Sequence, residues 1–369
     1  MKIEFVDLKA QYLSIKDEIN SCILNVFEKS SFVSGPFVKS FEENFARAHN
    51  VKYCVCVNSG TSALHIAMWA LGIKEGDEVI LPTFTFFATP EAVSLCGAKP
   101  VFVDIEEEYF NIDPELIEMA ITPKTKAIIA VHLYGQPAQL DKIKAIAEKN
   151  NLLLIEDCAQ AHLAEYKRKK VGSFGICGCF SFYPGKNLGA YGEGGAVLTN
   201  DSELYLKMLA LRDHGSLKKY YHDYIGHNYR MEGIQGAILD VKLKYLNDWT
   251  EKRRKNAILY RKYLAEIKEV ALPLEMPDTK HVYHLFVIRT PKRDELIKYL
   301  QDNGIFAGIH YPVPCHLQKA YRFLNYQQGQ FPISERYANC VLSLPMFPEL
   351  TEAQIQFVFQ KVKEFFNSL

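Results

Sequence analysis

Leu152-Leu-Leu-Ile-Glu-Asp-Cys-Ala-Gln-Ala-His162 begins with four apolar residues and continues with two carboxylates. An apolar run without alternation is typical of a strand that is buried on both faces of a sheet. In open α/β sheets, ligands bind beyond the carboxyl ends of the strands. The stretch therefore predicts a parallel sheet with Asp157 at its ligand-binding edge. Taken alone, Asp157 fits a second role equally well, as the cap of the helix or turn that follows.

Short apolar runs alternate with amphipathic stretches over the first two-thirds of the chain, which predicts a mostly parallel sheet flanked by helices. The expected strands are 53–57, 78–81, 99–103, 125–131, 152–156 and 178–182. The expected helices are 62–71, 90–95, 114–120 and 139–149, with Asp113 as a cap before Pro114.

A long helical pattern over 234–245 continues through the charged residues 247–262 and suggests a helix that links two domains. Beyond it, we expect strands at 284–288 and 305–309 and helices at 294–301 and 352–366, which form a smaller α+β domain. The sequence thus predicts a large α/β domain over residues 1–245 and a small C-terminal domain over 246–369.

Composition excludes several classes of protein. The 43 basic and 43 acidic residues cancel, so the basic surface of a nucleic-acid-binding protein is not expected. The charged N-terminus and the lack of a long apolar run predict a cytoplasmic protein without membrane contact. Nine cysteines, several within apolar runs, indicate buried thiols, and their spacing does not suit a zinc site or any other metal site.

Lys186 lies in Cys179-Phe-Ser-Phe-Tyr-Pro-Gly-Lys-Asn-Leu-Gly-Ala-Tyr-Gly-Glu-Gly-Gly195, directly after an expected strand. Pro184 and Gly185 form a turn that would present its amine at the same sheet edge as Asp157. Most lysines are solvated on the surface, and this is the alternative reading. The flanking residues here are apolar, hydroxylic or glycine, and the glycines allow tight turns around a planar ligand. We therefore favour a catalytic lysine.

An amine and a carboxylate at one sheet edge are the pair that pyridoxal phosphate requires. The amine holds the aldehyde as a Schiff base, and the carboxylate pairs with the pyridine nitrogen so that the ring accepts electrons. Lys186 and Asp157 are the candidates for these roles.

A phosphate site is expected where Asn58-Ser-Gly-Thr-Ser-Ala-Leu-His65 joins a strand to a helix. Gly60 makes the turn, and the amides of Thr61 and Ser62 lie at the positive end of the helix. Ser and Thr are also ordinary N-caps that need no ligand. Ser181 offers a further hydroxyl. In Pro82-Thr-Phe-Thr-Phe-Phe-Ala-Thr89, Phe86 is the candidate to stack on the pyridine ring, with a core position as its alternative.

These segments together resemble the DegT/DnrJ/EryC1 family of sugar-nucleotide aminotransferases, which have the aspartate-aminotransferase-like fold known as fold type I. The resemblance extends to Val131-His-Leu-Tyr-Gly-Gln-Pro137, Gly192-Glu-Gly-Gly195 and Asn228-Tyr-Arg-Met-Glu-Gly-Ile-Gln235, in the family's order. It covers nearly the whole chain.

The resemblance implies a role for each candidate residue. Lys186 would bind pyridoxal 5'-phosphate and move protons, Asp157 would pair with the pyridine nitrogen, and Gln160 would donate a hydrogen bond near the ring hydroxyl. Asn228 would reach the phosphate of a second subunit, which implies a homodimer with two shared sites. Arg230 would receive a carboxylate of the amino donor. The residues implied for substrate binding are Tyr183, Arg230, His310, Tyr311 and His316.

In the implied reaction, L-glutamate converts the cofactor to pyridoxamine 5'-phosphate, 2-oxoglutarate leaves, and the amine passes to a nucleotide-linked keto sugar. Gly308-Ile-His-Tyr-Pro-Val-Pro-Cys-His-Leu-Gln318 resembles members that aminate carbon 3 of dTDP-3-keto-6-deoxyhexoses or UDP-3-keto-aminouronates, and residues 281–286 favour the first group. This aromatic loop is alternatively a packed joint between domains. The product would enter deoxysugar biosynthesis, for lipopolysaccharide or another acceptor.

Two other functions stay open. One is an aminotransferase that acts at carbon 4 of the sugar or on a UDP sugar. The other is a regulator that binds the cofactor without turnover, which the presence of Lys186, Asp157 and Gln160 disfavours.

Overall fold

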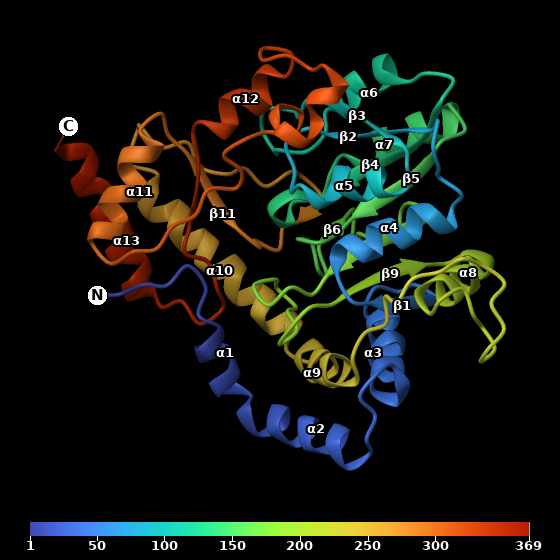
Figure 1. Ribbon diagram of the computed structural model, residues 1–369. Coiled ribbons are helices and arrows are strands. Elements are labelled where there is room, and N and C mark those ends of the chain that lie inside the picture. The colour runs from blue at the N-terminus through green and yellow to red at the C-terminus, as the bar shows by residue number, and fades with distance from the viewer. Residues whose placement is uncertain (369) are drawn as a thin grey trace.

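The computed structural model describes residues 1–368 and has at its centre a seven-stranded sheet covered by helices on both faces (Figure 1). The strand order is β1-β9-β8-β5-β4-β2-β3, and only β9 runs antiparallel to its neighbours. Its strands are β1 Tyr53–Val57, β2 Glu78–Pro82, β3 Lys99–Val103, β4 Thr125–Val131, β5 Leu153–Asp157, β8 Cys177–Ser181 and β9 Gly195–Thr199. The expected α/β fold with a mostly parallel sheet is confirmed.

Each face of the sheet has its own apolar core because side chains alternate between faces along a strand. On β1, Val55 and Val57 belong to one core and Cys54 and Cys56 to the other. The first core is completed by α4 Gly60–Ala70, α5 Ala88–Leu95 and α8 Ser202–Arg212. The second is completed by α3 Gly35–Ala48, α6 Pro114–Ala120, α7 Leu140–Lys149 and α9 Gly233–Leu243. Asp113 caps α6 as expected, since its side chain accepts the Glu115 amide.

The C-terminal part has a third core, built around the antiparallel pair β11 Phe286–Arg289 and β12 Val341–Leu344. The helices of this part are α10 Leu246–Leu264, α11 Arg293–Asp302, α12 Pro332–Ala338 and α13 Glu352–Asn367, with 3-10 turns η2 Cys315–Leu317 and η3 Lys319–Leu324. The N-terminus returns to this part, because Ile3 packs in the third core and pairs with Ile305. The third core therefore contains residues from both ends of the chain.

Remaining elements are peripheral. Helices α1 Leu8–Ser14 and α2 Lys16–Glu28 lie at the lower edge of the molecule (Figure 1). A small three-stranded sheet consists of β6 Glu165–Tyr166, β7 Lys169–Lys170 and β10 Thr279–Lys280, and η1 Leu133–Gly135 is a single 3-10 turn after β4. None of the helices in residues 1–368 combines the length and apolarity that crossing a bilayer requires.

Two expectations about local structure are wrong. Residues 305–309 form no strand, because the segment makes only isolated bridges, from Ile305 to Ile3 and from Gly308 to Ser343. The helical pattern over 234–262 is not one helix: it breaks between α9 and α10. At the break, Lys244 and Tyr245 both contact Glu18 of α2, the lysine with an Nζ–Oε2 distance of 3.0 Å. These contacts fix the two helix ends against α2.

Glu156, next to Asp157, is a fully buried carboxylate that holds the loop after β5. It accepts the amides of Gly172, Phe174 and Gly175 at 2.7–2.8 Å and lies 3.2 Å from His132 Nε2. Burial alone would raise the pKa of Glu156, but the bond from His132 and the amide bonds outweigh it, so the pKa is lowered. The carboxylate is therefore held in its charged form.

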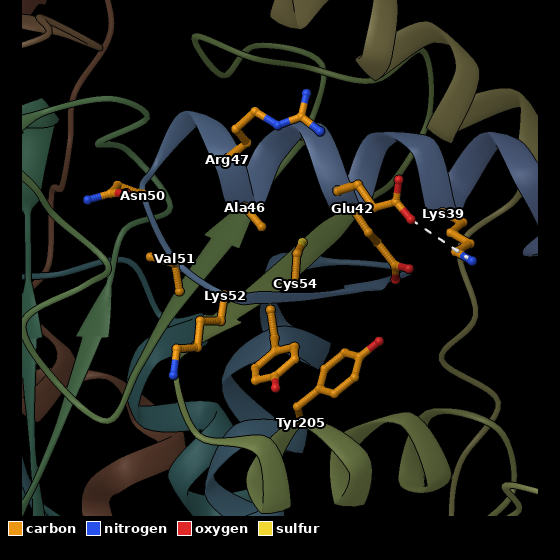
Figure 2. Close-up of a pocket in the computed structure, with 11 residues that line it drawn as sticks. Lys39, Glu42, Ala46, Arg47, Asn50, Val51, Lys52, Cys54 and Tyr205 are labelled. Atoms are coloured by element: carbon orange, nitrogen blue, oxygen red, sulfur yellow. Dashed lines mark ion pairs between the residues drawn. The ribbon is translucent and has the colours of Figure 1, made fainter.

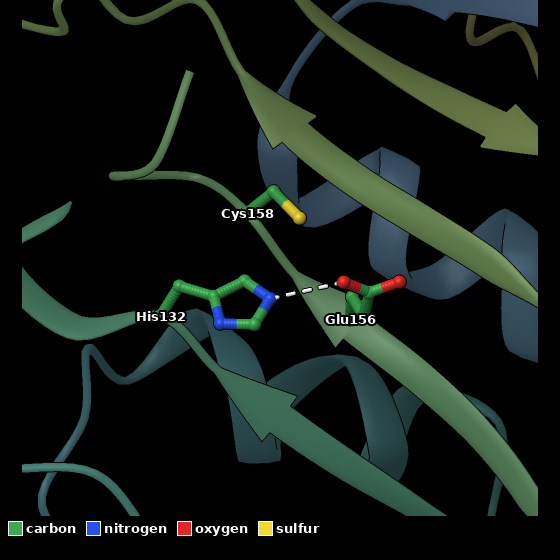
Figure 3. A group of neighbouring side chains, drawn as sticks. All are labelled: His132, Glu156 and Cys158. Carbon is green, nitrogen blue, oxygen red and sulfur yellow. Dashed lines mark hydrogen bonds and ion pairs between the residues drawn. The ribbon is translucent and has the colours of Figure 1, made fainter. Parts of the chain in front are cut away.

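The group His132, Glu156 and Cys158 has donor atoms close enough to hold a metal ion (Figure 3). However, His132 Nδ1 accepts the Ala138 amide at 3.0 Å, which assigns the ring proton to Nε2, and Nε2 donates to Glu156. With both imidazole nitrogens and both carboxylate oxygens engaged, His132 and Glu156 form a structural hydrogen-bond network beside Cys158.

We expect Glu156→Gln to lower the free energy of unfolding by about 2–4 kcal/mol, because buried amide donors would face an amide NH₂ group. A carboxyl whose pKa is lowered by folding stabilises above its unfolded pKa of about 4.3 and loses that effect as pH falls through the lower folded value. The difference between wild type and variant in urea unfolding should therefore shrink below about pH 4. Exposed Glu115→Gln is the control, and equal stability of the two variants would contradict this assignment.

Candidate active site

Asp157 ends β5, and its side chain is held from two sides. Thr89 Oγ1 donates to Oδ2 at 2.9 Å, and the Ala159 amide donates to Oδ1 at 3.1 Å. Of the two expected roles of Asp157, the structure shows the cap, because Oδ1 accepts from the turn that follows, while Oδ2 accepts from Thr89. Thr89 was not singled out from the sequence, although it closes the quoted 82–89 segment and its spacing from Phe86 could have indicated it.

Lys186 lies in the loop between β8 and β9, close enough to Asp157 for their charges to interact. Burial lowers the pKa of Lys186 to about 8, against the opposing effect of the Asp157 carboxylate. Burial likewise raises the pKa of Asp157, against its hydrogen bonds and the charge of Lys186. The structure therefore brings the predicted amine and carboxylate together, because β5 and β8 are adjacent parallel strands with Asp157 opposite Cys179.

The start of α4 forms a cradle of backbone and hydroxyl groups. Ser59 is the N-cap and accepts the Ser62 amide at 3.0 Å, so Ser62 lends its amide to the cap rather than to a ligand. The amide of Thr61 lies in the same first turn. A Cβ at Gly60 would come within 2.6 Å of Ser181 Cβ, so glycine is what lets this turn approach the strand. Of the predicted phosphate ligands, Gly60, Thr61 and Ser181 lie together at the start of α4.

Gln160 is buried with a fixed orientation. Its Oε1 accepts the Tyr134 amide at 2.7 Å, which leaves the NH₂ group as the donor that faces the site. One of these hydrogens reaches the Tyr311 hydroxyl at 3.0 Å, and Tyr134 in turn donates to the carbonyl of His310. Tyr134 lies in the quoted 131–137 segment but was not identified from the sequence as the residue that orients Gln160.

Two predicted aromatic contacts are exposed. Phe86 and Tyr183 each keep 55% of their accessible surface, so the core alternative for Phe86 does not hold. The Phe86 ring lies 5.8 Å from that of Tyr311, a residue of the second half of the chain. Phe86 is therefore available to a planar ligand.

The segment that carries Asn228 and Arg230 lies beside the cradle, since the Asn58 amide donates to the Tyr229 carbonyl at 2.9 Å. Asn228 is exposed. Arg230 pairs with Asp213 in the same chain, so a carboxylate ligand would have to share or replace this partner.

His310 and His316, both predicted to contact the substrate, differ in their exposure. His310 is partly buried near Lys186, its Nδ1 lies 2.8 Å from Ser343 Oγ, and burial lowers its pKa to about 4. His316 is 2% exposed, with Nδ1 2.7 Å from Thr83 Oγ1 and Nε2 3.2 Å from Glu335. The expectation of substrate contact is thus not supported for His316, because it is buried and both ring nitrogens have partners within the protein.

Pyridoxal phosphate fits these groups chemically. A half-buried amine, a buried carboxylate, an amide donor, an exposed ring and a helix N-terminus next to a serine hydroxyl are the kinds of contact that the cofactor requires. The glycines near Lys186 have a different purpose from the one expected: a Cβ at Gly195 would lie 2.1 Å from the Ser59 carbonyl oxygen. Glycine is required there because two backbone segments of the same chain lie close together, and not because a ligand needs the space.

A hollow elsewhere on the surface lies between α3, β1 and α8 (Figure 2). It is lined by charged residues of α3 and by Tyr53 and Tyr205, whose rings stack with centroids 4.5 Å apart. Its lining includes none of the predicted site residues.

Comparison with known proteins identifies relatives along the whole chain. Residues 13–363 match the model of the DegT/DnrJ/EryC1/StrS aminotransferase family. A protein named "Pleiotropic regulatory protein" from Geobacillus stearothermophilus is 47% identical, with 100% of this chain and 99% of that protein covered.

Two further relatives are named as sugar-nucleotide enzymes. The UDP-N-acetyl-3-dehydro-alpha-D-glucosamine 3-aminotransferase of Acidithiobacillus ferrooxidans is 45% identical over 96% of this chain and 95% of its own. The dTDP-3-amino-3,6-dideoxy-alpha-D-galactopyranose transaminase of Aneurinibacillus thermoaerophilus is 44% identical over 98% and 99%, respectively.

Among solved structures, S. venezuelae DesV in complex with a ketimine intermediate superimposes with a TM-score of 0.97 at 42% identity, covering 99% of this chain and 98% of that one. The sequence match and the fold match indicate the same family. The chain belongs to the DegT/DnrJ/EryC1/StrS aminotransferase family and is a pyridoxal-phosphate-dependent aminotransferase.

Proposed function

We propose that the protein transfers the amino group of L-glutamate to carbon 3 of a dTDP-3-keto-6-deoxyhexose, giving a dTDP-3-amino-3,6-dideoxyhexose. The observation that carries the proposal is the pair of half-buried Lys186 and buried Asp157 in a chain 44% identical to a dTDP-3-amino-3,6-dideoxyhexose transaminase. L-glutamate as donor follows from the resemblance that the sequence motifs carry.

Lys186 supplies the base. Because burial lowers the pKa of its amine to about 8, a useful fraction is neutral near physiological pH and can take a proton from a carbon and return it to a neighbouring one. When bound, the cofactor supplies an electron sink for the carbanion that this proton transfer leaves. Asp157 favours a protonated pyridine nitrogen, since an opposite charge nearby stabilises both ionised groups.

The other residues of the site are proposed to bind and orient the cofactor and the substrate. The Thr61 amide and the Ser181 hydroxyl would bind the phosphate at the helix N-terminus, and Gln160 would donate to the ring hydroxyl. Phe86 would stack on the ring. Tyr183, His310 and Tyr311 would contact the sugar nucleotide, and Arg230 would exchange Asp213 for a carboxylate of the donor.

A UDP-linked 3-keto sugar is the second candidate substrate. It is favoured by the relative from Acidithiobacillus ferrooxidans, whose identity to this chain is about as high as that of the dTDP enzyme. A cofactor-binding regulator is the third candidate, which the name of the Geobacillus relative favours. The intact pair of Lys186 and Asp157 argues for turnover.

We further propose a homodimer in which Asn228 of each chain completes the other chain's phosphate site. Asn228 is exposed, and the loop before it presents an apolar surface that a second copy would cover. The exposed apolar side chains of this loop are Leu217, Tyr220, Tyr221, Tyr224 and Ile225.

The substrate assignment is tested by incubating the pyridoxamine 5'-phosphate form with 3-keto and 4-keto sugars linked to dTDP or UDP. We expect amination at carbon 3 of the dTDP-linked 6-deoxy sugar, identified by NMR of the product. Lys186→Ala should lower turnover at least about 1,000-fold, because proton transfer by a positioned group contributes up to about 10⁴-fold. Lys74→Ala, in an exposed turn, is the control. A UDP product would favour the second candidate, and no product with any sugar would favour the regulator.

The pH dependence of the proton-transfer step should reflect the lowered pKa of Lys186. Because the neutral amine is the base, single-turnover rates with pyridoxamine-form enzyme should rise as pH increases through about 8. Asp157 favours the charged amine, so in Asp157→Asn the midpoint should move to lower pH while the rate falls. A midpoint that moves upward in this variant, or stays, would contradict the coupling.

Shared sites are tested with two inactive variants, Lys186→Ala and Asn228→Asp, the second of which repels phosphate. We co-express the two chains with different tags and isolate the mixed dimer. If each Asn228 serves the partner's site, the mixed dimer holds one wild-type site and should recover about half of the wild-type rate. No recovery would mean that each site is built from one chain.

A further inference from the structure

Lys242 is a fully buried lysine on α9, outside the set of residues that the proposed mechanism uses. Its ammonium donates to the carbonyl of Gly189. The same ammonium lies 4.8 Å from the ring centroid of Tyr191 and 6.0 Å from that of Trp249. The ammonium thus contacts a carbonyl and two aromatic faces rather than a carboxylate.

Burial of such a cation is costly. Removing an ammonium from water costs several kcal/mol unless hydrogen bonds or opposite charges compensate, and burial lowers the pKa of Lys242 to about 7 against the weak effect of Glu349. An aliphatic side chain would fill the same space at lower cost. The contacts with Gly189 and Tyr191 indicate the role of this ammonium.

Both Gly189 and Tyr191 belong to the loop 182–194 that carries Lys186. A second residue of α9 binds the same loop, because Gln235 Oε1 accepts the Tyr191 amide at 3.0 Å. Gln235 and Lys242 are seven residues apart and therefore lie on one face of the helix. That face fixes the loop at two points on the C-terminal side of Lys186.

The other side of the ammonium connects to the second half of the chain. Trp249 is on α10, and one turn later Arg253 donates to the carbonyls of Tyr283 and Met346 at 3.1 and 2.8 Å. Asn187, the neighbour of Lys186, donates to the Val282 carbonyl at 3.0 Å. The loop is therefore held between α9, α10 and the 282–283 segment.

We propose that Lys242 is a positioning residue, whose buried ammonium holds the loop 182–194 and so keeps the Lys186 amine in place beside Asp157. This inference rests on the proposed role of Lys186 and extends it to a residue that does not touch the reacting atoms. The aromatic faces of Tyr191 and Trp249 stabilise the cation where water is excluded.

The test compares Lys242→Met, which keeps the length and removes the charge, with Lys242→Arg and with Lys244→Met. Lys244 is two residues further along the chain, exposed, and paired with Glu18, so it controls for loss of a lysine at this helix end. We expect kcat of Lys242→Met to fall at least about tenfold with KM for L-glutamate within about twofold, because misplacement by about 1 Å can cost on the order of 100-fold. Lys242→Arg should restore most of the rate, and Lys244→Met should match wild type.

A second readout does not depend on turnover. In cofactor-free protein, the rate at which acetic anhydride labels Lys186 is followed across pH by peptide mass spectrometry. A loop released from α9 exposes the amine, so in Lys242→Met the labelling should be faster and its midpoint should lie above that of wild type, closer to the ordinary lysine value near 10.4. If Lys242→Met only lowers the unfolding temperature, with labelling and kcat unchanged, the residue is structural and the proposal is wrong.

Should Lys242→Met fail to fold, Gln235→Ala tests the same contact surface, because it removes the acceptor of the Tyr191 amide without burying a charge. It should change labelling and kcat in the same direction, and unchanged values would overturn the proposal. Failure of the proposed function is distinguishable, since it would appear as normal turnover in Lys186→Ala.

Discussion

The site depends on one pair of opposite charges at the carboxyl edge of the sheet, the half-buried Lys186 and the buried Asp157. Burial disfavours the charged form of both Lys186 and Asp157, while each charge favours the other. The pair exists because β5 and β8 are adjacent and parallel, so that the end of one strand and the loop after the other meet. An amine in this environment is neutral often enough to act as a base, yet a nearby cationic ring nitrogen would find a carboxylate already in place.

Around this pair, the protein uses rigid contacts between backbone segments rather than flexible side chains. Glu156 gathers three amides of the loop after β5, and the helix start at Gly60 is pressed against Ser181. Lys242 and Gln235 bind the carbonyl and amide of the next loop. Each contact fixes backbone, and backbone position determines where the short side chains at the site point. A site built this way is already ordered before any ligand enters.

Much of this arrangement could be predicted from the sequence because local patterns carry it. Three strands of the large sheet, the edge strands β1 and β3 and the inner strand β4, have the expected bounds, since their mainly apolar runs end at clear turn signals. The antiparallel strand β9 was not expected, because Gly195 and its neighbours resemble a ligand-binding turn more than a strand. The position of His316 was not predicted for a similar reason: its neighbours indicate an aromatic loop, whereas its ring is held by Thr83, 233 residues away, and by Glu335.

The contacts that the sequence could not reveal are those that join the two halves of the chain. The Tyr311 hydroxyl accepts from Gln160, and Asn187 donates to the Val282 carbonyl. In each case a residue from beyond position 245 completes a group that the first half only begins. The residues proposed to bind the cofactor lie mainly in the first half of the chain, whereas the aromatic loop at 308–318 lies in the second. Because Tyr311 of this loop accepts from Gln160 and His310 lies near Lys186, a substitution in the loop would act on both halves of the site.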